Sequence, residues 1–183
     1  IDIEHLTVIF NPGTPDERSA ISDLSLSVPK GQWISVIGSN GAGKTTLLNA
    51  IAGTVPVASG SIILDARDCS RDPEYRRART VGRVRQDPTA GTAPEMTVLD
   101  NLALASRKGP RRLLPAKPAS LRRLLAERLA ELGMGLEERT DENVSRLSGG
   151  QRQALTLLMA AMTRPAVLLL DEHTAALDPR NAD

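Results

Sequence analysis

The sequence predicts an α/β fold, in which strands and helices alternate at both ends of the chain around a helical insert at about residues 90–150. Three observations predict it. A glycine-rich loop at residues 38–45 lies between a predicted strand and a predicted helix. The continuous apolar run at residues 167–170 is typical of a strand buried on both faces of a sheet. Residues 121–132 repeat leucine at helical spacing, which predicts a helix within the insert.

The composition is that of a globular domain, with 40% apolar and 25% charged residues in a chain of 183. The formal net charge of +1 provides no strong overall field that would indicate nucleic acid or membrane as the partner. The single cysteine, Cys69, excludes an internal disulfide framework and agrees with a reducing compartment. No apolar run approaches the roughly 20 residues of a bilayer span, and no signal-peptide pattern opens the sequence.

Two alternating segments predict the first part of the fold. Residues 1–10 and residues 21–28 alternate apolar and polar side chains, with the period of a half-buried strand. Two prolines and a glycine predict a loop over residues 11–18. Residues 33–37 predict a further short apolar strand, which runs into Gly38.

A helix and a strand are predicted after the glycine-rich loop. The helix covers residues 44–52 and ends at Gly53. Residues 61–64 predict a strand. A short helix then begins with Asp72 as its N-cap and Pro73 at its first position.

The middle of the chain changes to helical signals after a predicted strand at residues 81–86. Thr97 begins a helix over residues 98–105 with a capping-box pattern. Residues 107–117 form a basic linker with two prolines, and the helix at residues 121–132 ends at a glycine.

The loop at residues 38–45 fits the pattern G-x-x-x-x-G-K-[ST]. Its glycines allow successive N–H groups to point inward, and the following helix directs its positive end to the same place. We therefore predict a phosphate site in which Lys44 reaches the β- and γ-phosphates and the Thr45 hydroxyl binds Mg²⁺. The alternative is a glycine-rich turn with an exposed lysine. The predicted nucleotide-binding residues of this loop are Gly38, Ser39, Asn40, Gly41, Ala42, Gly43, Lys44, Thr45 and Thr46.

Two carboxylates follow the apolar run at residues 167–170. Ligands bind at the carboxyl ends of strands in open α/β sheets. Asp171 is therefore predicted to hold the Mg²⁺ shell, and Glu172 to polarise the attacking water. The alternative is that the two acids cap the next turn.

A third motif, Leu-Ser-Gly-Gly-Gln at residues 147–151, opens a long helix that ends before Pro165. Its simplest interpretation is a capping box between Ser148 and Gln151. That interpretation leaves Gly149 and Gly150 unexplained, since each costs about 1 kcal/mol in a helix relative to alanine. We predict that an anion approaches this helix N-terminus closely.

With these motifs the chain resembles the ATP-binding subunit of an ABC transporter, and the resemblance covers essentially the whole sequence. Gln86 matches the family's Q-loop glutamine, which contributes to catalysis and to the metal, and residues 176–178 match its D-loop. Phe10 matches the aromatic residue that stacks on adenine. The resemblance implies a P-loop (RecA-like) nucleoside triphosphatase core with an antiparallel β edge and a helical subdomain at residues 90–150.

The family's mechanism implies ATP and Mg²⁺ as ligands and a second ATPase subunit as partner. Two subunits pair head to tail, so that each ATP lies between residues 38–45 of one chain and residues 148–151 of the other. Lys44, Gln86 and Glu172 are the implied catalytic residues. The helical insert docks on permease subunits at the cytoplasmic face of the membrane.

The sequence departs from the family at two places. The family's switch histidine and the central strand that carries it are missing from residues 1–183, so we expect an incomplete domain without its C-terminal strands, marginally stable and poorly active. His173 replaces the proline that usually follows the catalytic glutamate. It either tunes Glu172 or is a tolerated loop residue. Together with the loop at residues 11–18, it resembles importers of amino-acid-type solutes, which implies an extracytoplasmic solute-binding protein.

Arginine is concentrated in two stretches, with six between residues 71 and 85 and seven basic residues without an acid between residues 107 and 123. Contact with RNA, DNA or anionic lipid is one interpretation. A solvated face plus a docking surface is the other, and the scarcity of interleaved aromatics favours it over nucleic acid. Two rival functions stay open: a soluble member of the family acting in translation or DNA repair, and a non-catalytic nucleotide-binding fragment.

Overall fold

The structure is a computed structural model that describes residues 1–85, 87–106 and 119–171. The chain divides into two compact units, residues 1–81 and residues 82–183, which are described one after the other. The predictions for Gln86, the basic linker, Glu172, His173 and the D-loop lie outside the described residues.

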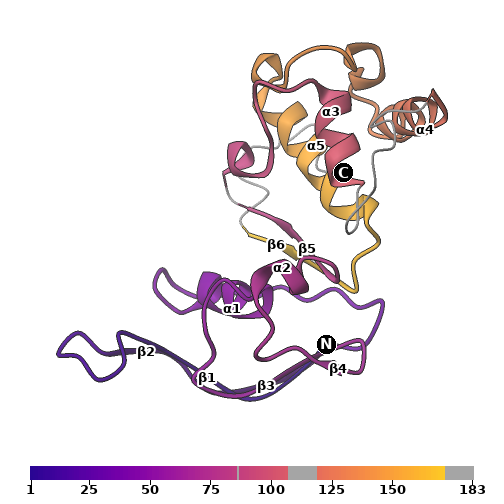
Figure 1. The fold of residues 1–183 in the computed structure, drawn as a ribbon. Coiled ribbons are helices and arrows are strands. Elements are labelled where there is room, and N and C mark those ends of the chain that lie inside the picture. Colours follow the sequence, from indigo (N-terminus) through magenta and orange to yellow (C-terminus); the bar gives the residue numbers. More distant parts are fainter. Residues whose placement is uncertain (86, 107–118, 172–183) are drawn as a thin grey trace. The chain divides into compact units, whose positions relative to one another are not determined.

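The first unit is built on a four-stranded antiparallel sheet (Figure 1). Its strands, in the spatial order β2-β1-β3-β4, are β2 (Arg18–Ser27), β1 (Asp2–Phe10), β3 (Ser59–Leu64) and β4 (Arg67–Asp68). The predicted antiparallel edge is therefore confirmed. Strand β2 begins at Arg18, three residues before the predicted start, because Arg18 still pairs with Phe10 across the ladder.

Two helices accompany this sheet. Helix α1 (Lys44–Ala52) has the predicted bounds and ends at Gly53, which adopts a φ of 80°. Helix α2 (Glu74–Arg77) is shorter than a typical helix, and Pro73 rather than Asp72 is its N-cap. The prediction for Asp72 is wrong because its carboxylate forms ion pairs with Arg67 and Arg76 instead of capping the helix.

The strand predicted at residues 33–37 is absent from the described part of the chain. Trp33 is 85% and Ile37 92% exposed. A strand forms only where its backbone groups pair with a neighbour, and no described strand lies alongside this segment. Apolar composition alone was not sufficient to predict it.

The second unit contains a two-stranded sheet of β5 (Val81–Val84) and β6 (Val167–Leu170). The bounds of β6 match the prediction, and β5 is two residues shorter than expected. In the residues that the structure describes, β6 is half-buried rather than buried on both faces, because β5 is its single neighbour.

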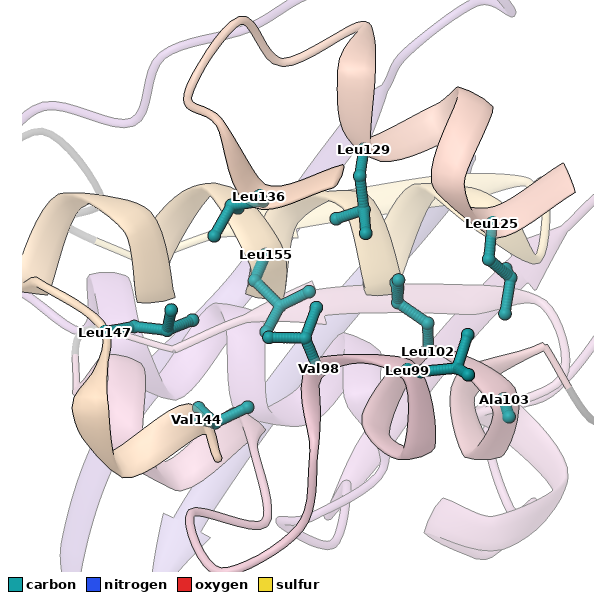
Figure 2. Packing of buried hydrophobic residues seen from close by; sticks show 10 residues of the cluster. All are labelled: Val98, Leu99, Leu102, Ala103, Leu125, Leu129, Leu136, Val144, Leu147 and Leu155. Carbon is teal, nitrogen blue, oxygen red and sulfur yellow. The ribbon is translucent and has the colours of Figure 1, made fainter. Parts of the chain in front are cut away.

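A helical cluster forms the core of the second unit (Figure 2). Its helices are α3 (Val98–Ala105), α4 (Ala119–Ala130) and α5 (Gly149–Met162), with the short 3-10 helices η1 (Pro88–Gly91), η2 (Leu136–Arg139) and η3 (Val144–Arg146). The Thr97 cap of α3 is confirmed, since its side chain accepts a hydrogen bond from the Asp100 N–H. Figure 2 shows Leu155 of α5 among leucines of α3 and α4, all of them fully buried. The cluster consists of Val98, Leu99, Leu102, Ala103, Leu125, Leu129, Leu136, Val144, Leu147 and Leu155.

The arginines between residues 71 and 85 do not all lie on a solvated face, which corrects the sequence interpretation. Arg77 is 2% exposed, and the Arg83 side chain is 16% exposed. Both have polar partners that the sequence does not reveal. In the described ranges, no helix is both long enough and apolar enough to cross a bilayer.

Candidate functional site

The N-terminus of α1 carries no side-chain cap. Its N-cap position is Gly43, no acidic residue lies in its first turn, and Leu47 N–H closes the first helical hydrogen bond to the Gly43 carbonyl at 2.8 Å. The first N–H groups of a helix point outward along its axis, where they favour an anion. The helix that follows the glycine-rich loop therefore offers, at the predicted phosphate position, N–H donors that no side chain in the described part of the chain caps.

Lys44 folds back over the loop that precedes it. Its Nζ donates to the Gly38 carbonyl at 2.7 Å and to the Ser39 carbonyl at 2.9 Å. These acceptors are neutral, so phosphate oxygens placed in the loop would compete well for the same ammonium. Thr45 is exposed at the first turn of α1.

The glycine at position 43 is required by the fold itself. Its φ is 88°, and an added Cβ would lie 2.8 Å from the Ala20 carbonyl oxygen in β2. Gly41 also has a positive φ of 83°. The glycine-rich loop thus packs closely against strand β2, and its glycines allow the backbone conformations that this close approach requires.

Phe10 is the last residue of β1, an inner strand of the sheet, and it is 37% exposed. Its Cα pairs with that of Arg18 in β2. The Arg18 guanidinium in turn reaches the loop, since Nη2 lies 4.0 Å from where a Cβ at Gly41 would be. This connection brings the predicted adenine-stacking residue and the predicted phosphate loop to one region of the first unit.

Sequence reasoning missed Arg18, because it was assigned to the loop at residues 11–18. The local pattern gives no signal for it, since Arg18 and Ser19 are both exposed and the next two residues of β2 are both half-buried. Its exposed guanidinium adds a positive charge beside the loop.

Asp171 lies directly after β6 in the second unit. Its N–H donates to the Val84 carbonyl at 3.1 Å, which fixes the backbone beside β5. Its carboxylate Oδ2 lies 3.8 Å from Arg83 Nη2, and the Asp171 side chain is 13% exposed. The predicted metal ligand is therefore held next to a cation that the sequence did not single out. Its neighbour Glu172 lies outside the described residues, as does Gln86.

The capping box at the start of α5 is present as predicted. Gln151 N–H donates to Ser148 Oγ at 3.2 Å, and Ser148 N–H donates to Gln151 Oε1 at 3.2 Å. The side chains of these two residues are thus occupied in holding the first turn.

Gly149 and Gly150 have no role in the packing of the described chain. An added Cβ at Gly149 would meet nothing within 4 Å, and one at Gly150 would meet only the Met134 Cε at 3.9 Å. Neither has a positive φ. Alanine would fit at both positions against the described residues, so the packing of the described chain does not account for the two glycines.

Comparisons with known proteins agree with this arrangement. The profile of a family described as "ABC transporter" matches residues 21–175. A tyrosine transport ATP-binding protein of Clostridioides difficile is 42% identical over the whole of this chain, which covers 73% of that protein. A sulfate/thiosulfate import ATP-binding protein of Chromobacterium violaceum is 40% identical, and a spermidine/putrescine import ATP-binding protein of Haemophilus influenzae is 36% identical. This chain spans only 43% and 40% of the lengths of those two proteins.

Two solved structures share the fold. One is a dimeric post-hydrolysis state of an ATP-binding cassette bound to ADP and Pi, and the other is a dimeric bacterial ABC transporter cassette. Each superposes with a TM-score of 0.81 at 24% sequence identity, covering 98% of this chain and 77% of the other. The predicted P-loop α/β fold is thereby confirmed.

Proposed function

The chain belongs to the ABC transporter family, and from this membership we propose that it is the ATP-binding subunit of an importer, which hydrolyses ATP to move a solute across a membrane. The observation that carries the proposal is the open first turn of α5 at Gly149 and Gly150. Among the residues that the structure describes, nothing occupies this opening, and a subunit that closes on the nucleotide of a second copy would use it.

ATP binds, in this proposal, along the path from Phe10 to the start of α1. Phe10 stacks on the adenine, and Arg18 lies between that ring and the loop. Lys44 exchanges its two carbonyl partners for phosphate oxygens. The backbone from Gly38 to Thr46 supplies the remaining donors, at the N-terminus of a helix that no side chain caps.

A second copy of the chain completes the nucleotide site. Its Ser148, Gly149, Gly150 and Gln151 approach the γ-phosphate, whose charge is complementary to the N-terminus of α5. ATP thus stabilises the closed pair, and hydrolysis removes the charge that holds it. Gln86 and Glu172 act on the water and the metal. The cycle is a two-state equilibrium that the nucleotide biases.

The residues fit a bound Mg²⁺ by the chemistry of their donor set. Mg²⁺ prefers oxygen ligands and is commonly bound by one or two protein groups together with substrate phosphates. The Thr45 hydroxyl and the Asp171 carboxylate are oxygen donors of this kind, with Gln86 as a third. When bound, the ion neutralises charge that develops on the phosphates.

We assign residues 1–183 to one ATPase domain, in which residues 90–150 are the helical subdomain. That subdomain docks on permease subunits, so the protein is peripheral on the cytoplasmic face of the membrane. An amino-acid-type solute agrees with the printed name of the tyrosine transport relative, and such a solute implies an extracytoplasmic binding protein. The relatives named above are all transport proteins, which supports transport over a role in translation or DNA repair.

Replacing Lys44 by alanine tests the nucleotide site. Hydrogen bonds to a charged group contribute about 1.5–3 kcal/mol, so we expect Mg-ATP affinity to fall roughly 10- to 100-fold. Isothermal titration calorimetry measures this directly. Lys30→Ala removes another exposed lysine of the same unit and serves as the control. Equal affinities for the two variants would contradict the site, and absence of Mg-ATP binding by the parent protein would refute the proposed function.

The variant Gly149→Ala is expected to affect self-association without lowering the stability of the folded chain. Alanine favours the helix by up to about 1 kcal/mol, so thermal unfolding should shift upward or stay unchanged. The added methyl group projects into the space reserved for the second copy's nucleotide, so ATP-driven self-association should weaken at least tenfold. Sedimentation velocity with and without Mg-ATP measures it. Ala161→Ser, on the exposed face near the other end of α5, is the matched control. Normal association of Gly149→Ala would rule out the role given to this glycine.

A further inference from the structure

Arg139 joins three separate segments around the start of α5. It is the last residue of η2, and its Nε donates to Glu142 Oε2 at 2.5 Å. Its Nη1 donates to Gln151 Oε1 at 2.8 Å, and its Nη2 donates to the Arg146 carbonyl at 3.4 Å. One rigid guanidinium therefore connects the loop before α5 with the first turn of α5.

The bond from Arg139 is the shortest of the three hydrogen bonds that orient the Gln151 amide. Gln151 Oε1 accepts from both Arg139 Nη1 and the Ser148 N–H, while Gln151 Nε2 donates to the Met134 carbonyl. A guanidinium has no acceptor, so the reversed amide would present its NH₂ group to two donors. Arg139 thus reinforces the orientation that closes the capping box, which the Ser148 N–H and the Met134 carbonyl also favour.

The position of Arg139 is unfavourable for the helix taken alone. Cations near a helix N-terminus oppose the helix dipole, which makes them destabilising there. Glu142 compensates part of this charge, and the same hydrogen bond lowers the pKa of the Glu142 carboxyl and raises the pKa of Arg139. Both members of the pair accordingly stay ionised. A cation beside an uncovered helix N-terminus adds to the positive potential there, which favours the binding of an anion.

We propose that Arg139 is a positioning residue for the γ-phosphate site that α5 offers to a second copy of the chain. It acts through Gln151, whose amide it holds together with the Ser148 N–H and the Met134 carbonyl, and so keeps the open first turn at Gly149 and Gly150 in its binding geometry. The inference rests on the proposed function, since it presumes that α5 closes on a nucleotide held by another copy.

The chain provides a matched control in Arg128, which pairs with Glu131 at the same spacing that separates Arg139 from Glu142. Arg128→Ala removes an exposed ion pair at the C-terminal end of α4, and Arg128 does not contact Gln151. We expect Arg139→Ala to weaken Mg-ATP-driven self-association about tenfold relative to Arg128→Ala, measured by sedimentation velocity. Mg-ATP affinity of the separated subunits should be the same in both variants, because that site is formed by residues 38–45.

Two further variants exclude a merely structural role. Arg139→Lys keeps the charge but cannot donate to Glu142, Gln151 and Arg146 together, so it should recover only part of the association. Gln151→Ala should weaken association, and adding Arg139→Ala to it should cause no further loss. Additive losses, full recovery by lysine, or unchanged association in Arg139→Ala would each overturn the inference. A parent protein that binds Mg-ATP without associating would instead refute the proposed dimer, and the inference with it.

Discussion

Replacing Glu172 by glutamine is expected to lower ATP turnover by at least about 100-fold, the usual contribution of a positioned acid or base. Glu172 follows Asp171 at the carboxyl end of β6, and the resemblance assigns it to the attacking water. An amide of the same shape cannot accept a proton from that water. Lys44 and the loop at residues 38–45 are untouched, so Mg-ATP should bind with unchanged affinity.

The same variant should accumulate as an ATP-bound dimer. The proposed cycle reopens the pair only when hydrolysis removes the γ-phosphate, and blocking that step leaves the closed state populated. Phosphate release and sedimentation velocity measure the two effects. Glu127→Gln, an exposed glutamate on α4, is the control and should behave as the parent protein. Turnover of Glu172→Gln at the parent rate would remove Glu172 from the mechanism.

The elements that were predicted accurately carry their own end signals. Helix α1 ends at Gly53, whose φ of 80° suits glycine, and α5 begins at Ser148 with both hydrogen bonds of the capping box. Strand β6 lies between Pro165 and two acids, with the predicted bounds. In each case the backbone requirement is met by residues within a few positions, so a local pattern is sufficient to predict it.

The prediction at residues 33–37 failed because a strand depends on its neighbour. Its apolar residues satisfy the local pattern, but the described part of the chain pairs no strand with them. The burial of β6 was overestimated for the same reason. Composition indicates where a strand is possible, whereas pairing is decided by residues far away in the sequence.

The parts of the candidate site that belong to a sequence motif were predictable. The single arginines that contact those parts were not. Lys44 and the Ser148–Gln151 turn were identified from spacing. Arg18, Arg83 and Arg139 were not, since an arginine in a charged stretch gives no indication of whether its guanidinium reaches a loop, a carboxylate or an amide. Such contacts depend on tertiary structure, so the sequence does not show which group each guanidinium contacts.

Arg77 provides the largest expected effect on stability. Its side chain is buried in the first unit, and all four of its hydrogen bonds run to backbone carbonyls. Nη1 donates to Ala50 at 2.5 Å and to Ile51 at 3.1 Å, at the C-terminal end of α1, where a cation is favoured. Nη2 and Nε donate to Ser70 and Asp72. One guanidinium therefore ties the end of α1 to the segment that precedes α2.

Arg77→Met fills a similar volume without a donor and leaves several of these carbonyls unpaired. An unpaired buried polar group costs about 1–3 kcal/mol, so we expect a loss of roughly 3 kcal/mol, or about 6–12 °C in Tm. The space beside Gly53 does not offset this loss of stability. In the parent protein that space holds the Arg77 side chain, whose Cδ lies 2.9 Å from where a Cβ at Gly53 would be. Urea unfolding followed by circular dichroism measures the change in the free energy of unfolding.

Arg76→Met is the matched control for this experiment. Arg76 is the preceding residue of α2, its side chain is 56% exposed, and its ion pair with Asp72 spans 3.6 Å. Exposed pairs contribute about 0–1 kcal/mol, so Arg76→Met should unfold close to the parent protein. If Arg77→Met were as stable as Arg76→Met, the hydrogen bonds of the buried Arg77 guanidinium would not be what stabilises the C-terminal end of α1. If it is less stable, α1 loses its C-terminal anchor, and Mg-ATP affinity at Lys44, the first residue of the same helix, should fall with it.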